Sequence, residues 1–429
     1  MSETLAVVFG VALAFVVYVL VLYFVRSTPV KRVSWLDGEP NELNVATSRF
    51  ASTFALFAST PMRQRCVVEV LANGDETFPR LWDDLSTAES LITWQVFWVK
   101  PGQLADRALD VLANRAHRGV RVLCLLDAFG SRGLGDAFRS RLERAGAEVA
   151  TFRPFTRENL YKVQQRMHIR SVVVDGRTGY TGGFGIDDRW MGDGRQLGSW
   201  RDTNVRIEGP IVDELQATFA THWAETTGEL LLGAHASGHS VVDDAHTSHA
   251  GVLRAVPTLG STAAERMFVL SILGARHRLY ISNAYFVPGR SLRRLMCEAV
   301  TRGVDVRVLT PGANTDRRSA WLAARSHYRE LLDGGVRVYE YRPTMIHAKT
   351  LVADGCWSCI GSVYFDNRSM KLNDEVAVVS DDPVVASRLE SLFLEDLEHA
   401  TEIDRAVVET RSTRDRVAEH AARLVAPLL

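Results

Sequence analysis

The segment Met167-His-Ile-Arg-Ser-Val-Val-Val-Asp175, followed by Gly182-Gly183, is matched later in the chain by Ile346-His-Ala-Lys-Thr-Leu-Val-Ala-Asp354, followed by Gly361-Ser362. In each copy a cation stands two residues after the histidine and an aspartate seven residues after it. A pair of small residues begins seven residues after the aspartate. One such match would be weak evidence, but two in register, each on a strand-like run, are improbable by chance. The repeat predicts a chain built from two similar halves.

Alternate side chains of an extended strand point to the same face, so each histidine shares a face with the cation that follows it. The two pairs are His168 with Arg170 and His347 with Lys349. An imidazole can attack or transfer a proton near neutral pH, and a neighbouring cation can hold an anionic oxygen. Each pair is therefore a candidate catalytic unit for chemistry on a phosphate.

The remaining motif residues also have expected roles. Asp175 and Asp354 belong to the catalytic motif, but they fall on the opposite face at the strand ends, before glycine, where anchoring a turn suits them better than chemistry does. The small residues are expected to let backbone amides approach a bound phosphate without obstruction. These candidate substrate-binding residues are Gly182, Gly183, Gly361 and Ser362.

The pattern His-x-Lys-x4-Asp-x6-Gly-Ser, present twice, resembles the phospholipase D superfamily, and the finer details resemble its bacterial cardiolipin synthase branch. The likeness runs from about Cys66 to the C-terminus. The stretches that carry it are Tyr285-Phe-Val-Pro288, Met345-Ile-His-Ala-Lys349, Phe365-Asp-Asn-Arg-Ser369, Asn373-Asp-Glu375 and Pro427-Leu-Leu429. The resemblance implies that both histidines meet in one active site. One forms a phosphohistidine with the phosphatidyl group, and the other protonates the departing alcohol.

The resemblance favours His168 as the nucleophile and His347 as the acid and base. Spacing alone leaves the roles open, and the reversed assignment is the alternative because the first half departs more from the family pattern. Asp202 and Glu375 stand where the family places a carboxylate on the far nitrogen of the active histidine. Such a contact fixes the tautomer and stabilises the imidazolium. Because cations can hold the non-bridging oxygens, neither a metal ion nor another cofactor is expected.

Three positions depart from the family pattern. Arg170 stands where lysine is usual, which keeps the charge but not the compact ammonium geometry. Gly185 and Tyr364 stand where each motif normally has an asparagine. These differences make altered substrate choice, reduced activity or a binding-only role more plausible than a perfect match would.

The N-terminal segment contains an uncharged apolar run from Leu5 to Val25, long enough to cross a bilayer as one helix. Arg26, Lys31 and Arg32 follow it, so the positive-inside rule predicts a cytoplasmic catalytic body. A cleaved signal peptide fits poorly, because no basic leader precedes the run and no small-x-small cleavage site follows it. A transmembrane anchor is the preferred interpretation.

Downstream of this run the sequence repeats one α/β unit. The first copy has a helix over 78–89, a strand over 92–97, a helix ending at Arg118-Gly119 and a strand over 120–126. The second copy has a helix over 264–276, a strand over 279–284, a helix ending at Arg302-Gly303 and a strand over 304–309. Strands that alternate with helices predict mostly parallel sheets flanked by helices. The expected fold is therefore α/β, with two phospholipase D-like halves related by pseudo-twofold symmetry and one N-terminal transmembrane helix.

The expected organisation is a transmembrane anchor over 1–26, a juxtamembrane segment over 27–61, a first half over 62–232, a linker over 233–251, a second half over 252–400 and a C-terminal helix over 401–429. The linker is rich in Ala, His, Ser and Asp, and its histidines are expected to be solvated rather than to bind metal. The C-terminal helix is expected to be amphipathic and to pack on the catalytic body.

Composition agrees with this organisation. The chain has 429 residues, of which 46% are hydrophobic, so it can bury a large core. A net charge of −1 gives no general attraction to nucleic acid, which argues against the nucleases of the family. The five cysteines are odd in number and scattered, which suits a reducing compartment. Cys356 and Cys359 have metal-ligand spacing but no completing pair, so structural roles are expected.

Together, the resemblance and the apolar N-terminus predict a single-pass enzyme of the bacterial inner membrane. The predicted reaction transfers a phosphatidyl group from phosphatidylglycerol to a second phospholipid alcohol, giving cardiolipin and glycerol. One alternative is a hydrolytic phospholipase D, in which water resolves the intermediate. Another is an anionic-lipid-binding protein with a weakened site. Sequence does not separate them, because acceptor choice depends on pocket shape and water exclusion.

Overall fold

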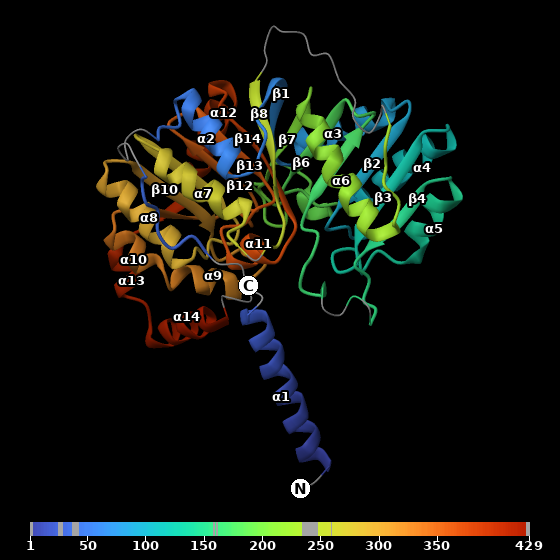
Figure 1. Cartoon of the computed structure of the whole chain (residues 1–429). Coiled ribbons are helices and arrows are strands. Elements are labelled where there is room, and N and C mark those ends of the chain that lie inside the picture. The colour runs from blue at the N-terminus through green and yellow to red at the C-terminus, as the bar shows by residue number, and fades with distance from the viewer. Residues whose placement is uncertain are drawn as a thin grey trace.

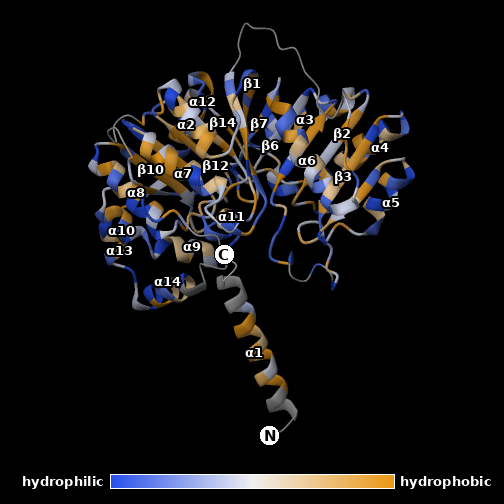
Figure 2. Cartoon of the chain, viewed as in Figure 1, coloured by the Kyte–Doolittle hydropathy of each residue, from blue (hydrophilic) through white to orange (hydrophobic). Residues whose placement is uncertain are grey.

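The structure is a computed structural model, and it describes residues 3–24, 29–36, 43–157, 159, 162–233, 248–258 and 260–425. The helix α1 (Glu3–Phe24) projects away from a broad α/β body (Figure 1). Its side chains are described from Val7 to Tyr18, and these are exposed. Figure 2 shows that this helix consists largely of hydrophobic residues. Over the described residues, no helix is both long enough and apolar enough to cross a membrane, so the predicted transmembrane helix is not supported here.

One continuous 15-stranded sheet runs through the body in the order β15-β11-β10-β9-β12-β13-β14-β8-β1-β7-β6-β5-β2-β3-β4. The first seven strands are β1 (Arg63–Ala72), β2 (Leu91–Val96), β3 (Arg121–Asp127), β4 (Glu148–Phe152), β5 (Arg170–Val174), β6 (Thr178–Gly182) and β7 (Thr203–Glu208). The others are β8 (Ser248–Ala255), β9 (Arg278–Asn283), β10 (Asp305–Pro311), β11 (Arg337–Tyr341), β12 (Lys349–Ala353), β13 (Trp357–Gly361), β14 (Glu375–Ser380) and β15 (Ala400–Ile403). Apart from β15, the strands on the two sides of the central β8–β1 pair follow the same order. Outward from β8 they are β14, β13, β12, β9, β10 and β11, and outward from β1 they are β7, β6, β5, β2, β3 and β4. The two halves are thus pseudo-twofold copies.

The expectation of mostly parallel sheets is wrong. Among the strands of the described residues, the parallel pairs are β2–β3, β3–β4, β9–β10 and β10–β11, which form through the predicted strand–helix–strand units. The motif strands instead form hairpins, β5 with β6 and β12 with β13, which continue antiparallel to the centre. Three-residue turns, over 175–177 and 354–356, explain this, because they reverse the chain at once and leave no room for a crossover helix. Each begins with an Asp-Gly pair in which both residues have positive φ.

Helices cover both faces of the sheet (Figure 1). Those of the first half are α3 (Asn73–Thr87), α4 (Gln103–His117), α5 (Asp136–Arg144), the short 3-10 helix η3 (Asp188–Trp190) and α6 (Ile211–Thr227). Those of the second half are α7 (Ala263–Gly274), α8 (Arg290–Thr301), α9 (Arg318–Arg325), α10 (Tyr328–Asp333), α11 (Asn367–Lys371) and α12 (Pro383–Glu398). The repeated helix and strand positions predicted from the sequence are confirmed. Both α4 and α8 end at the predicted Arg-Gly pairs, where glycine takes a positive φ.

The two halves share a core. One buried cluster joins side chains of β1 and β7 to side chains of β14 and α12, including Val68, Val205, Val376 and Phe393. In addition, α6 of the first half packs on β8, and α12 of the second half packs on β1. The halves are therefore interlocked across the centre of the sheet, and this holds the two histidine strands in fixed positions.

Several expected boundaries differ from the structure. The segment expected to be juxtamembrane contains α2 (Ser48–Phe57), whose Phe50 and Phe54 rings pack 4.9 and 4.6 Å from Trp357 in the second half. Strand β8 begins at Ser248, inside the stretch expected to be linker; its pairing with β1 and β14 orders these residues. His249 accordingly contacts Asp381 at 2.8 Å. The rest of the linker, with His235, His239 and His246, lies outside the described residues.

The C-terminal region is not one helix. β15 pairs with β11, and two helices follow, α13 (Arg405–Glu409) and α14 (Thr413–Val425). α14 packs on α9, which confirms the expected contact with the body. The motif Pro427–Leu429 lies outside the described residues.

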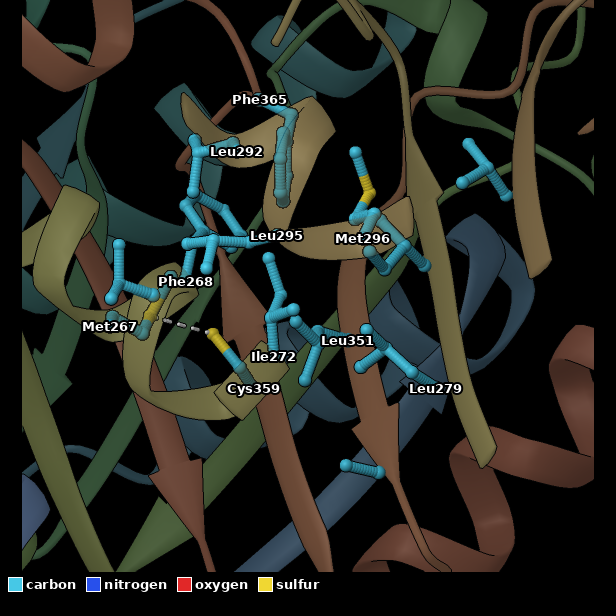
Figure 3. Close-up of a cluster of buried hydrophobic side chains, with 14 of the residues drawn as sticks. Met267, Phe268, Ile272, Leu279, Leu292, Leu295, Met296, Leu351, Cys359 and Phe365 are labelled. Carbon is cyan, nitrogen blue, oxygen red and sulfur yellow. Dashed lines mark hydrogen bonds between the residues drawn. The ribbon is translucent and has the colours of Figure 1, made fainter. Parts of the chain in front are cut away.

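The cysteines are unpaired, and Cys359 belongs to the core under α7. Its Sγ lies 3.2 Å from Sδ of Met267, among leucine and phenylalanine side chains (Figure 3). Burial raises the pKa of the Cys359 thiol to about 12, so it stays protonated and packs as a small apolar side chain. This agrees with the structural role expected for it.

Candidate active site

The two motif histidines line one cavity of about 400 Å³. His168 precedes β5 and His347 precedes β12, and both are buried, with 5% and 3% of their surface exposed. Each half thus brings its imidazole to the same space. Both histidines therefore border one cavity, and their catalytic roles stay a prediction.

Backbone hydrogen bonds tie each histidine to the opposite half. The amide of His168 donates to the carbonyl of Asp374 at 2.9 Å, and the amide of Asp374 donates to Arg166 at 2.9 Å. In the same way, the amide of His347 donates to Arg201 at 2.6 Å, and that of Arg201 donates to Met345 at 2.9 Å. These crossed bridges fix the separation of the two imidazoles.

The carboxylates also cross between halves. Glu375 of the second half contacts Nδ1 of His168, with Oε2 at 2.9 Å. Asp202 of the first half contacts Nδ1 of His347, with Oδ2 at 2.8 Å. Each imidazole is therefore oriented by a carboxylate of the other half, which contacts Nδ1 and not Nε2.

The two carboxylates differ electrostatically. Burial raises the pKa of Glu375 to about 8, although Ser362, Ser369 and Asn373 all donate hydrogen bonds to it. Burial also acts to raise the pKa of Asp202, but the charges on Lys349 and His347 and the hydrogen bonds it accepts lower that pKa overall. Asp202 is thus the stronger stabiliser of a protonated imidazole.

Arg170 fixes the proton of His168. Its Nη1 lies 2.8 Å from Nε2 of His168, and its Nε donates to the carbonyl of Phe184 at 3.0 Å. A guanidinium cannot accept a hydrogen bond, so Nε2 must accept and the ring proton sits on Nδ1, facing Glu375. Burial and the Arg170 charge lower the pKa of His168 well below its usual value. Nε2 of His168 is therefore unprotonated, and its lone pair accepts from Arg170.

His347 has a different set of neighbours. Nζ of Lys349 lies 2.9 Å from its Nε2, and Oη of Tyr364 lies 2.7 Å from the same atom. Burial and the Lys349 charge lower the pKa of His347 to about 3, against the opposing effect of Asp202. Lys349 and Arg170 both lower the pKa of His347 through their positive charge. A bound phosphate anion would offset these charges and favour protonation of His347.

Asp175 and Asp354 lie outside the cavity, as turn anchors. The Asp175 carboxylate accepts from the amides of Glu89, Ser90 and Leu91, at 2.8, 2.8 and 2.9 Å. The Asp354 carboxylate accepts from three consecutive amides, of residues 276 to 278, each at 2.8 Å. Both aspartates have φ of 53°. They therefore position the hairpins and contact no reacting group.

The small residues of the motif do not offer free amides to a phosphate, contrary to the expectation. The amide of Gly183 donates to Oδ1 of Asn204 at 3.0 Å, and that of Ser362 donates to the Val376 carbonyl at 2.8 Å. A Cβ on Gly183 would lie 2.3 Å from the Asp202 carboxylate, and one on Gly361 would lie 2.3 Å from the Val376 carbonyl. Gly182 likewise makes room for Asn204. The three glycines therefore leave space for the Asp202 carboxylate and for the neighbouring strands. Ser362 Oγ donates a hydrogen bond to Glu375.

Trp190 is a site residue that the sequence did not single out. Its Nε1 donates to Oδ2 of Asp202 at 2.8 Å, and its ring lies 5.2 Å from the ring of His347. A Cβ on Gly185 would lie 2.8 Å from this indole. The departure from asparagine at Gly185 thus provides the space that Trp190 fills, and the missing side chain was the signal that could have pointed to it.

The rest of the cavity wall was also missed, since it comes from loops after several different strands. Aromatic rings and arginines dominate it, with two carboxylates: Phe97, Trp98, Phe129, Trp200, Tyr285, Arg166, Arg317, Arg368, Asp316 and Asp366. Asp366 caps α11 by accepting from the Ser369 amide at 2.8 Å. Such a wall combines shielding from water with positive charge, which suits an anionic group bearing an organic substituent.

Comparison with known proteins agrees with this geometry. The family model described as "Cardiolipin synthase, PLD-like domain" matches residues 269–397. A cardiolipin synthase of Geobacillus thermodenitrificans is 33% identical over 361 residues, covering 84% of this chain and 72% of that protein. Cardiolipin synthase A of Pseudomonas fluorescens is 32% identical over 412 residues, covering 92% and 83%.

Among solved structures, the fold is similar to that of a phosphatidylserine synthase from Haemophilus influenzae, with a TM-score of 0.66 and 13% identity. That match covers 89% of this chain and 100% of the other, and it concerns the fold alone. The identity to the curated relatives, over most of both chains, carries the assignment. This chain belongs to the bacterial cardiolipin synthase branch of the phospholipase D superfamily.

Proposed function

We propose that this chain transfers a phosphatidyl group from phosphatidylglycerol to the alcohol of a second phospholipid, forming cardiolipin and releasing glycerol. The observation that carries the proposal is the pair of buried imidazoles facing one cavity, each held by a carboxylate from the opposite half. A phosphodiester needs a nucleophile on one side and a proton for its alkoxide on the other, and this pair supplies both. Its family membership supports the same reaction.

In the first step, Nε2 of His168 attacks phosphorus. A P–N bond forms, the bond from phosphorus to the glycerol oxygen breaks, and a proton held at His347 moves to that oxygen. In the second step, the acceptor alcohol returns a proton to His347 as its oxygen attacks phosphorus and the P–N bond breaks. His347 takes the acid role because Asp202, whose pKa is lowered, stabilises its imidazolium. His168 takes the nucleophilic role because burial raises the pKa of its own partner, Glu375, to about 8, so an imidazolium is less stabilised there.

The cations serve the non-bridging oxygens. Arg170 and Lys349 each lie within hydrogen-bond distance of a reactive Nε2, at 2.8 and 2.9 Å. Arg170 is therefore placed on the side of the nucleophile and Lys349 on the side of the acid, where they can offset the charge that develops on the non-bridging oxygens. The aromatic wall favours an alcohol over water as acceptor, because it limits the water that reaches the intermediate.

The test is incubation of the purified protein with phosphatidylglycerol. We expect cardiolipin and glycerol in equal amounts, and His347→Ala should slow their formation by about 10²–10⁴-fold, the range for losing a general acid–base group. Phosphatidic acid as the sole product would replace the proposal with a hydrolytic phospholipase D. An unchanged lipid profile in cells that carry only His347→Ala would indicate a lipid-binding role instead.

We also propose that the N-terminal helix brings this site to the membrane, as a single crossing of the bacterial inner membrane with the body in the cytoplasm. The uncharged run from Leu5 to Val25, with Arg26 and Lys31 after it, supports this from the sequence. Cell fractionation tests it: the full chain should remain in the membrane pellet after a carbonate wash, and a chain that starts at Pro29 should lose that retention. Release of the full chain by the wash would contradict the anchor.

A further inference from the structure

Tyr364 occupies the reactive side of His347. Nδ1 of His347 is taken by Asp202, so only Nε2 can exchange a proton with substrate. Oη of Tyr364 lies 2.7 Å from that Nε2, which is the position that an alcohol oxygen would need for direct transfer. The phenol oxygen therefore stands between His347 and any departing or attacking alcohol.

The ring of Tyr364 is held in this position from several sides. Its centroid lies 5.0 Å from that of His168 and 4.4 Å from that of Tyr285, and Nζ of Lys349 lies 4.5 Å from it. Tyr285 is itself fixed by a hydrogen bond from its hydroxyl to Asp316 at 2.8 Å. Only 6% of the surface of Tyr364 is exposed. With the ring held in this place, a proton that leaves Nε2 of His347 meets the Tyr364 hydroxyl first.

We propose that Tyr364 is a catalytic residue that relays the proton between His347 and the alcohol oxygen. This inference rests on the proposed function and adds to it a third group in the proton path. As the bond from phosphorus to the glycerol oxygen breaks, Oη gives its proton to that oxygen and receives the proton of His347 Nε2. On the return, the acceptor alcohol gives its proton to Oη, and Oη gives its own to Nε2. The phenol ends each step neutral.

The chemistry of the phenol suits this role. A hydroxyl can donate and accept at once, whereas the neighbouring ammonium of Lys349 can only donate. Burial raises the pKa of Tyr364 well above its usual value, so the hydroxyl keeps its proton when the site is at rest. The site is therefore set for a transfer in which both protons move together, without a tyrosinate.

The experiment uses Tyr364→Phe, which keeps the ring and removes the hydroxyl, and two donors that differ in their leaving group. With phosphatidylglycerol, we expect glycerol release to fall by about 10²–10⁴-fold. With the p-nitrophenyl ester of phosphatidic acid, the leaving phenolate needs no proton, so the first-turnover burst of p-nitrophenol should stay within about threefold of the wild type. This split depends on the leaving group, and a loss of packing would not produce it.

Tyr328→Phe is the matched control, because it removes another fully buried tyrosine hydroxyl, one that lies 3.2 Å from Glu340 and outside the cavity. It should leave glycerol release and the burst unchanged. Equal losses with both donors in Tyr364→Phe, or no loss with either, would overturn the relay.

Glycerol release separates this inference from the proposed function, since it occurs in transfer and in hydrolysis alike. Phosphatidic acid in place of cardiolipin would overturn the transferase while the Tyr364→Phe result still decides the relay. A wild-type protein that cleaves the aryl ester but releases no glycerol would overturn both.

Discussion

His168→Ala should lower phosphatidyl transfer by at least about 10⁴-fold, on the scale seen when the group that forms a covalent intermediate is removed. The lone pair on Nε2 of His168 has no substitute in the cavity, because the other imidazole is committed to Asp202 and Tyr364. The folded state should survive, since alanine keeps the backbone bridge from residue 168 to Asp374. Steady-state assays with phosphatidylglycerol and a thermal melt measure the two effects.

Mass spectrometry of the trapped intermediate identifies the nucleophile directly. In His347→Ala treated with the p-nitrophenyl donor, the first step needs no acid, but the acceptor lacks a base, so a phosphatidyl adduct should accumulate on the peptide that contains His168. His168→Ala should show no adduct under the same conditions. An adduct mapped to His347 in the wild type would reverse the two roles.

Asp202→Asn should reduce kcat by about 10³–10⁴-fold with little change in KM, by analogy with the loss of the orienting aspartate in serine-protease triads. Oδ2 of Asp202 accepts from both His347 Nδ1 and Trp190 Nε1, each at 2.8 Å, while Oδ1 accepts from the amide of Thr203. An amide in this place always turns an N–H toward one of these donors. It also removes the negative charge that stabilises the imidazolium.

The split between kcat and KM distinguishes this effect from a general disturbance of the site, because Asp202 lies behind His347 and is not among the residues that line the cavity. Asp381→Asn is a suitable control, since its carboxylate contacts His249 at the far end of β14. It should keep wild-type kinetics. A rise in KM with constant kcat for Asp202→Asn would contradict the orienting role.

Much of this arrangement was predictable because it is local. The βαβ units follow from the apolar runs and the Arg-Gly helix ends, and the Asp-Gly pairs after each motif strand encode the turns that Asp175 and Asp354 anchor. The pairing of two imidazoles followed from the repeat itself. Two orienters, Asp202 and Glu375, were found through the family resemblance.

The predictions that were wrong or incomplete concern features that depend on contacts between distant segments. Nothing in the sequence around Gly183 shows that Asp202 will fill the space beside it, so an amide cradle was the natural but wrong expectation. The direction of the strands depended on hairpin turns rather than on the alternation of strands and helices. Tyr364 was recognised as unusual, but its contact with His347 arises only when the loop after β13 folds over the cavity.

The crossing of carboxylates has a consequence for biosynthesis. When only the N-terminal half has been synthesised, His168 is present but its partner Glu375 is not. Asp202 is likewise present before its partner His347. The first half alone therefore contains only one imidazole, and that imidazole lacks the carboxylate that orients it. Reactivity begins when β14 takes its place beside β8, so completion of the fold and onset of catalysis coincide.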